Sequence, residues 1–234
     1  MSETCFLSPD SDDRPRSMPD ANVRQRRKAI LDLPHIAPLT AYVAGLRRRA
    51  TAEVPEFDPL DGGVDARVLF LFEKPGPMAA ESSKRTGSGF ISRNNDDATA
   101  EATFRFMEQS GIPRKLTVIW NVVPWWNGTR KVSSRELYRG STCVEELVKL
   151  LPALSAVVMV GKSAARAEQY LATTGLALIA SWHPGPLVKA RFRARWETIP
   201  FQWAKVMTIV ENLRALGPAS PQRSEADCAA KWIA

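Results

Sequence analysis

A histidine and the turn that follows it are the residues of this chain best placed to do chemistry. The chain has only two histidines among its 234 residues, and His183 lies in the sequence Ser181-Trp182-His183-Pro184-Gly185-Pro186. The apolar run 176–180 comes directly before it, so the pattern indicates a buried strand that opens into a rigid loop. A proline after the histidine also disfavours helical backbone at that point. Ligands of α/β proteins bind at such strand ends, so we expect His183 in a ligand site.

Polar and glycine residues accompany the other apolar runs as well. The expected strands are 67–72, 116–123, 155–160 and 176–181. Glu73 directly follows the first run, Asn121 lies near the end of the second, and Gly161 follows the third. If the strands are parallel, these three residues meet the histidine at one edge of the sheet. A carboxylate, an amide and an imidazole would then share one crevice, as a catalytic site requires.

The elements that position these residues alternate along the chain. Short, almost continuously apolar strands are typical of parallel strands covered on both faces. The sequence therefore predicts an α/β fold: a doubly wound three-layer α/β/α sandwich around a mainly parallel four-stranded sheet. Helices are expected at 22–33, 36–50, 97–110, 134–151, 162–173 and 196–215.

The composition limits the class of protein. We expect a disordered N-terminal segment at 1–20, one domain at 21–216 and a loose tail at 217–234. The net charge of +7 and the pI near 9.6 favour partners rich in phosphate. The three scattered cysteines include no CxxC pair and fit reduced thiols in the cytoplasm. There is no secretory leader and no run of about 18 apolar residues, so we expect no membrane span.

The motifs around the expected strand ends resemble those of the uracil-DNA glycosylase superfamily. Phe72-Glu73-Lys74-Pro75-Gly76 is similar to the first motif of that superfamily, which reads Gly-Glu-Ala-Pro-Gly in one branch. His183-Pro184-Gly185-Pro186 is similar to its second motif, His-Pro-Ser-Pro. Asn121 matches a strand-end asparagine that reads the base. Phe90 corresponds to a phenylalanine that stacks on the flipped base. The resemblance spans about residues 66–210.

The resemblance implies a DNA repair glycosylase that flips uracil, or a related deaminated base, out of DNA and hydrolyses its N-glycosidic bond. His183 and Glu73 would be the catalytic residues: the histidine would stabilise the negative charge on the departing base, and the glutamate would act on water or on the cationic sugar. Asn121, Phe90 and Gly76 would bind the base. We expect no metal, no organic cofactor and a monomer. In a bacterium, the protein would lie in the cytoplasm with the nucleoid.

A basic segment directly after the second motif suggests contacts with DNA. Its cations alternate with apolar residues, which suits phosphate binding, and Leu187 is expected to wedge into the vacated stack. A plain basic surface strand or helix start is the alternative. The expected DNA-binding residues are Leu187, Lys189, Arg191, Arg193, Arg195, Lys162 and Ser163.

Three departures from the family pattern leave other functions open. Phe72 replaces the glycine that opens the first motif, Lys74 stands where several branches carry aspartate or asparagine, and the cysteines of an iron–sulfur cluster are absent. A glycosylase for hypoxanthine or xanthine is one alternative. A catalytically inactive nucleic-acid-binding module of the same fold is another, and Lys74 is its best support. A small-molecule hydrolase would explain Glu73 and His183 but not the basic segment.

Overall fold

The fold is built around a central sheet of four parallel strands. The computed structural model describes residues 12–50, 52–82 and 87–215. The strands lie in the order β4-β2-β5-β6, with every neighbouring pair parallel. The register sets Phe72 beside Asn121 and Val160 beside Ser181, so these strands end at a common edge. Their bounds are β2 Val68–Phe72, β4 Thr117–Asn121, β5 Ala156–Val160 and β6 Ala177–Ser181.

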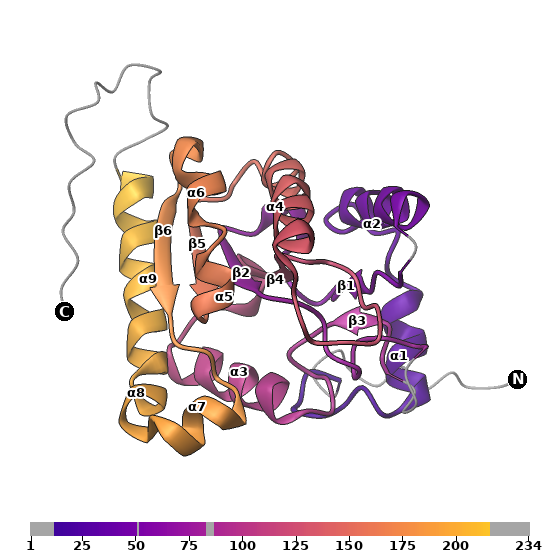
Figure 1. The fold of residues 1–234 in the computed structure, drawn as a ribbon, viewed down its shortest axis with the longest axis horizontal. Coiled ribbons are helices and arrows are strands. Elements are labelled where there is room, and N and C mark those ends of the chain that lie inside the picture. Colours follow the sequence, from indigo (N-terminus) through magenta and orange to yellow (C-terminus); the bar gives the residue numbers. More distant parts are fainter. Residues whose placement is uncertain (1–11, 51, 83–86, 216–234) are drawn as a thin grey trace, which may run out of the picture.

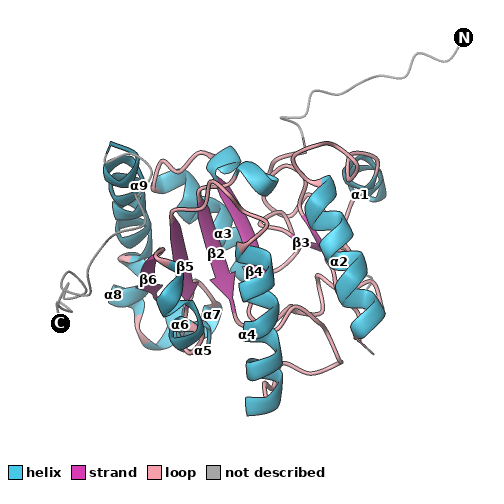
Figure 2. Cartoon of the chain, turned by 90° about the horizontal axis from the view of Figure 1, so that it is seen from above, coloured by secondary structure: helices cyan, strands magenta, loops and turns pink. Residues whose placement is uncertain are grey.

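Helices cover both faces of this sheet, as Figure 2 shows. Helices α3 (Ala98–Gln109) and α9 (Ile199–Ala215) pack against each other on one face. There Trp203 contacts Phe70 of β2 and Phe106 of α3, with ring centroids 4.9 and 6.1 Å apart. Helix α4 (Ser134–Val148) covers the other face together with the short helices after β5. The predicted three-layer α/β/α sandwich with its parallel four-stranded sheet is confirmed.

The connections place a crevice between β2 and β5. From β2 the chain crosses through α3 to the edge strand β4, and then returns through α4 to β5 on the other side of β2. The loops after β2 and β5 therefore leave toward opposite faces of the sheet. Ligands of open α/β sheets bind at such a switch point, outside the carboxyl ends of the strands. The two central strands are buried throughout, which fixes the position of the loops that follow them.

The observed helices follow the expected pattern with two differences (Figure 1). The stretch 162–173 is not one helix but two short ones and a 3-10 turn, and the basic segment after His183 forms two short helices. Helices α2 and α3 lie within one residue of their expected bounds. Helix α4 ends three residues early, α9 begins three residues late, and α1 ends five residues early, at Lys28. The other bounds are α1 Ala21–Lys28, α2 Ala37–Arg49, α5 Lys162–Ala165, α6 Glu168–Leu171, α7 Pro186–Arg191 and α8 Arg193–Glu197; the 3-10 turns are Gly63–Asp65, Arg114–Leu116 and Ala172–Thr174.

A second, small sheet was not predicted. Strand β1 (Glu56–Phe57) pairs in parallel with β3 (Phe90–Ile91) beside the main sheet. Strands of two residues are too short to show a period-2 pattern in a sequence. Their pairing fixes the position of the segment that runs from β3 to α3. This segment forms one wall of the cleft described below.

The prediction that residues 1–20 are disordered is wrong for residues 12–20. Asp13 accepts hydrogen bonds from Arg93 and Asn94 at 2.9 and 3.1 Å, and it also forms an ion pair with Arg114. The backbone N–H of Met18 donates to the carbonyl of Asn94 at 3.2 Å. The polar composition of this segment suggested disorder, but Asp13 has partners 80 to 101 residues further along the chain. Residues 1–11 and the expected tail, 217–234, lie outside the described residues.

The described residues contain neither a membrane-spanning helix nor a cluster of metal-binding side chains. Within ranges 12–50, 52–82 and 87–215, no helix combines the length and the apolar character needed to cross a membrane. Over the same ranges, no cluster of three or more histidine, cysteine, aspartate or glutamate side chains could hold a metal ion.

Candidate active site

A cleft of about 700 Å³ opens at the carboxyl ends of the parallel strands. Loops after β2, β5 and β6 form three of its sides, and the segment from β3 to α3 forms the fourth. The cleft is therefore at the switch point that the strand order predicts. The expected site residues that line it are Glu73, Gly76, Asn121, Lys162, Ser163, His183, Leu187 and Arg195.

His183 stands in the cleft as a neutral imidazole. Its Nδ1 accepts a hydrogen bond from the backbone N–H of Gly185 at 2.9 Å. Burial lowers the pKa of His183 below 6.5, and the charge of Arg130 acts in the same direction against that of Asp97. Because Nδ1 accepts, the proton of the neutral ring lies on Nε2, which is therefore a donor. The ring is also held edge-on to Phe72, with centroids 5.7 Å apart.

Two glycines make room for this imidazole. A Cβ on Gly185 would lie 2.6 Å from His183 Nδ1, and a Cβ on Gly161 would lie 3.1 Å from His183 Cβ. Gly161 also has φ of +90°, which disfavours any side chain there. The turns after β5 and β6 are therefore shaped around one histidine, and its orientation is fixed by the backbone.

Asn121 ends strand β4 with an amide that the protein leaves partly unused. Its side chain is 4% exposed and lines the cleft. Its Oδ1 is buried and has no hydrogen-bond partner within the described residues. An unpaired buried acceptor costs about 1–3 kcal/mol, so a ligand that supplies a donor would recover that cost. Neutral His183 and unpaired Asn121 thus face the same cleft.

The residues after β2 have different environments. Glu73 is half-buried and lines the cleft, and its backbone carbonyl accepts the N–H of Val123 at 2.9 Å. Gly76 also lines the cleft, but a Cβ there would meet nothing within 4 Å, so no close approach inside the protein requires this glycine.

Lys74 is held in a structural network. Its Nζ donates to Glu136 Oε1 and Asn127 Oδ1, both at 2.8 Å, and to the carbonyl of Lys131 at 3.2 Å. Burial would raise the pKa of Glu136, but hydrogen bonds from Lys74, Ser133 and Trp125 outweigh it and hold the pKa at about 2. Glu136 also closes the capping box of α4. The hydrogen bonds of the Lys74 amine therefore hold the loop before α4 in position.

Phe90 does not lie where its expected role requires. It is fully buried in a separate cluster with Met18 and Val23, and it does not line the cleft. The N-terminal segment, which was expected to be disordered, supplies the residues that cover its ring. Aromatic surface in the cleft comes instead from Phe72, Trp182 and Phe192. The position of Phe90 in the sequence matches the family pattern, but a position alone does not give the direction of the ring.

The basic segment forms helices at the rim of the cleft. Leu187 is 64% exposed, and both Leu187 and Arg195 line the cleft. Lys189 Nζ lies 4.6 Å from the ring centroid of Trp196, and the Arg195 guanidinium lies 4.7 Å from that of Trp182.

The other two arginines of the basic segment have different surroundings. Arg193 forms an ion pair with Glu197 at 2.9 Å. Arg191 is exposed but does not line the cleft.

The wall between β3 and α3 contains residues that the sequence did not single out. Ser92, Arg93 and Asn95 line the cleft and are each at least nine-tenths buried. Their signal in the sequence is a run of polar residues directly after a short apolar pair, which is ambiguous without the fold. The pairing of β1 with β3 and the docked N-terminal segment decide where this run lies.

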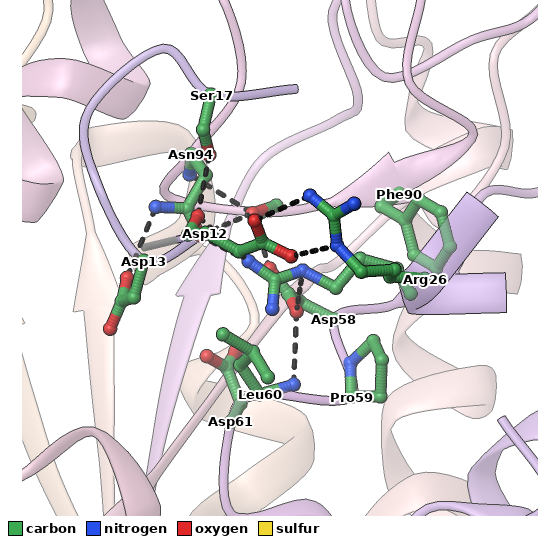
Figure 3. Close-up of polar contacts among 12 residues, drawn as sticks. Asp12, Asp13, Ser17, Arg26, Asp58, Pro59, Leu60, Asp61, Phe90 and Asn94 are labelled. Atoms are coloured by element: carbon green, nitrogen blue, oxygen red, sulfur yellow. Dashed lines mark hydrogen bonds and ion pairs between the residues drawn. The ribbon is translucent and has the colours of Figure 1, made fainter. Parts of the chain in front are cut away.

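A network of buried charges stands behind that wall (Figure 3). Asp58 accepts hydrogen bonds from Arg114 at 2.7 Å and from the Leu60 backbone at 3.0 Å, and it also accepts one from Ser92. Asp58 also forms an ion pair with Arg27, whose Nε lies 3.4 Å from Asp58 Oδ1. Burial opposes the charge on Asp58, but the two arginines outweigh it and hold its pKa at about 2. The network ties the N-terminal segment, the loop after β1 and the cleft wall together.

One family of known proteins matches the part of the chain that contains the four strands of the central sheet. A model of the uracil DNA glycosylase superfamily matches residues 59–206. The chain belongs to that superfamily. None of the curated protein sequences compared with the chain matches it. The match begins after the N-terminal segment and α2, so the part of the buried charge network that includes Asp13 and Arg27 lies outside the matched residues. Membership of the uracil DNA glycosylase superfamily indicates DNA glycosylase activity.

Proposed function

We propose that the protein hydrolyses the N-glycosidic bond of uracil in DNA and leaves an abasic site. The observation that carries the proposal is the presence of neutral His183 and unpaired Asn121 in one cleft at the switch point. A base inside a duplex cannot enter such a cleft, so the nucleotide must be flipped out, at a cost of a few kcal/mol.

Asn121 is suited to read the edge of uracil. Its amide offers one donor and one acceptor in a plane, which complements the O4 and N3–H groups of uracil. Cytosine presents the opposite pattern and would leave both amide groups unpaired in a buried site, so it should be rejected. Phe72 and Trp182 supply the aromatic surface of the cleft in place of Phe90.

His183 is suited to stabilise the departing base. Cleavage leaves electrons from the glycosidic bond on uracil and positive charge on the sugar. A proton on His183 Nε2 can be donated to O2 as negative charge develops there, and a preorganised donor of this kind contributes about 3–4 kcal/mol. The carboxylate of Glu73 lies in the same cleft and can take a proton from the attacking water or stabilise the sugar cation.

The proposal is tested with labelled oligonucleotides that carry a single uracil, hypoxanthine or xanthine. After incubation with the protein, alkali cleaves any abasic site. We expect strand scission that is fastest for the uracil oligonucleotide. Faster scission with hypoxanthine or xanthine would change the assigned base. A gel shift without scission of any oligonucleotide would instead favour the inactive binding module.

DNA binding should respond to salt in proportion to the phosphates contacted. We expect Arg191→Gln to reduce the slope of log K against log salt by about 0.7–0.9, because one counterion fewer is released. Arg193→Gln should change the slope less, because Glu197 already pairs with that guanidinium. Lys149→Gln, an exposed change at the end of α4, is the control. Fluorescence anisotropy between 50 and 200 mM salt measures all three. Equal slopes for Arg191→Gln and wild type would contradict the phosphate contact.

The expectations of a monomer and of a cytoplasmic location remain proposals. Sedimentation of the purified protein tests the first of them.

A further inference from the structure

Asn95 carries an unused hydrogen-bond acceptor in the wall of the cleft opposite the strand ends. Its side chain is 4% exposed and lines the cleft. Its Oδ1 is buried and has no hydrogen-bond partner among the residues that the structure describes. Within the described residues, Asn121 is the other asparagine whose buried Oδ1 has no partner, and it lines the same cleft.

The orientation of the Asn95 amide is fixed by its other end. Its Nδ2 donates to the carbonyl of Phe90 at 2.9 Å. Rotating the amide by half a turn would set Oδ1 against that carbonyl, oxygen to oxygen, which is unfavourable. The free group of Asn95 is therefore an acceptor, and its partner must be an N–H or O–H donor. Phe90 acts in this arrangement through its backbone rather than its ring.

The backbone that carries Asn95 is also rigid. Asn94, the residue before it, is fully buried, and its Nδ2 donates to Asp13 and to the carbonyl of Arg14 at 3.1 and 2.9 Å. Its Oδ1 accepts from Arg114 at 2.9 Å. Figure 3 shows Asn94 beside the N-terminal residues Asp12 and Asp13. The N-terminal segment thus holds the cleft wall from behind, and a side chain on such a support is preorganised for a ligand.

We propose that Asn95 is a substrate-contacting residue whose Oδ1 accepts a hydrogen bond from a donor in the reacting complex. The inference rests on the proposed glycosylase function. Two donors have the required chemistry: an O–H of the attacking water, or an N–H of the extruded base. Uracil has one N–H on its free edge, which Asn121 can accept, whereas xanthine has two. Without the acceptor at Asn95, the O–H of the water or the second N–H of the base would be left unpaired in a buried site.

The test replaces Asn95 by leucine, which keeps the branched shape of the side chain and removes both polar groups. We expect Asn95→Leu to lower kcat/KM about 10- to 100-fold on the preferred oligonucleotide. Asn95→Ala gives the same comparison if the leucine variant does not fold. Asn22→Leu is the same change at an exposed position of α1 and should leave kcat/KM unchanged. Melting temperatures show whether each variant is folded.

A second measurement separates the two donors. Oligonucleotides that carry the 2′-fluoro-2′-deoxynucleoside of uracil or of xanthine resist cleavage because the fluorine disfavours the sugar cation, and the Kd of each is compared with that of a thymidine oligonucleotide. If the donor is water, Asn95→Leu lowers kcat for every cleaved base and leaves the Kd unchanged. If the donor is the base, the Kd of the xanthine oligonucleotide rises about tenfold, because xanthine has a second N–H for Asn95, and the loss of kcat differs between bases. Either result supports the inference.

The inference is overturned if folded Asn95→Leu keeps kcat and Kd within twofold of wild type while the wild type cleaves uracil. In that case the proposed function stands and Asn95 only supports the Phe90 carbonyl. If the wild type cleaves none of the bases, the proposed function fails. Asn95 is then judged by the Kd alone, and equal values for variant and wild type overturn the inference as well.

Discussion

Replacing His183 by alanine is expected to lower kcat for uracil excision about 10²- to 10³-fold, which is the effect of removing one preorganised donor to a developing oxyanion. The Kd for uncleavable DNA should change little, because the donor acts mainly on charge that develops in the transition state. Single-turnover scission assays and anisotropy measure the two quantities. His35→Gln is the matched control, since His35 binds the carbonyl of Pro59 at 2.9 Å and does not line the cleft.

The pH dependence of stability gives an independent check on the neutral state of His183. Burial holds its folded pKa below 6.5, the value in the unfolded chain. Below that value the unfolded chain takes up a proton that the folded protein does not, so stability falls as the pH is lowered. We expect the free energy of unfolding of wild type to fall relative to His183→Gln between pH 7.5 and pH 5. A difference that stays constant with pH would mean that His183 is not buried as a neutral ring.

Replacing Asp58 by alanine is expected to destabilise the protein by about 3–5 kcal/mol, because it leaves buried Arg27 and Arg114 without their shared carboxylate. For a chain of this size that loss lowers the melting temperature by about 6–20 °C. Because Asp58 also accepts from Ser92, the cleft wall should loosen and uracil excision should fall too. Urea unfolding and scission assays measure both effects.

Two variants make the Asp58 experiment specific. Asp65→Ala changes an exposed aspartate in the nearby 3-10 turn and should cost less than about 0.5 kcal/mol. Asp58→Asn keeps the shape but removes the charge, so its loss of stability should lie between those of the two alanine variants. If Asp58→Ala were as stable as Asp65→Ala, the buried network would not contribute to holding the N-terminal segment against the domain.

The strands and the strand-end residues were predictable because their causes are local. A buried parallel strand needs a short apolar run, and the loop after it needs polar and turn-forming residues, so Glu73, Asn121 and His183 could be placed from the sequence. The parallel sheet then brings them together without any further signal. Lys74 shows the limit of this reasoning, because its partner Glu136 lies 62 residues further along the chain.

The wall opposite the strands depended on contacts that no local pattern records. Phe90 was expected in the cleft, but Met18 and Val23 draw its ring into a separate cluster. Asp13 was expected in a disordered segment, but in the structure it forms ion pairs with Arg93 and Arg114. Pairing of charges across 80 and 101 residues depends on the three-dimensional path of the chain, so composition could not reveal it.

The sequence by itself determined the parallel sheet, the cleft at its carboxyl edge and the three polar residues that the strands carry there, because strand patterns and turns are encoded within a few neighbouring residues. The tertiary structure alone decided what closes the cleft. It turned Phe90 away, engaged Lys74 with Glu136 and placed Asn95 in the opposite wall. These outcomes depend on long-range packing and on the pairing of buried charges, whose partners are adjacent only in the folded chain.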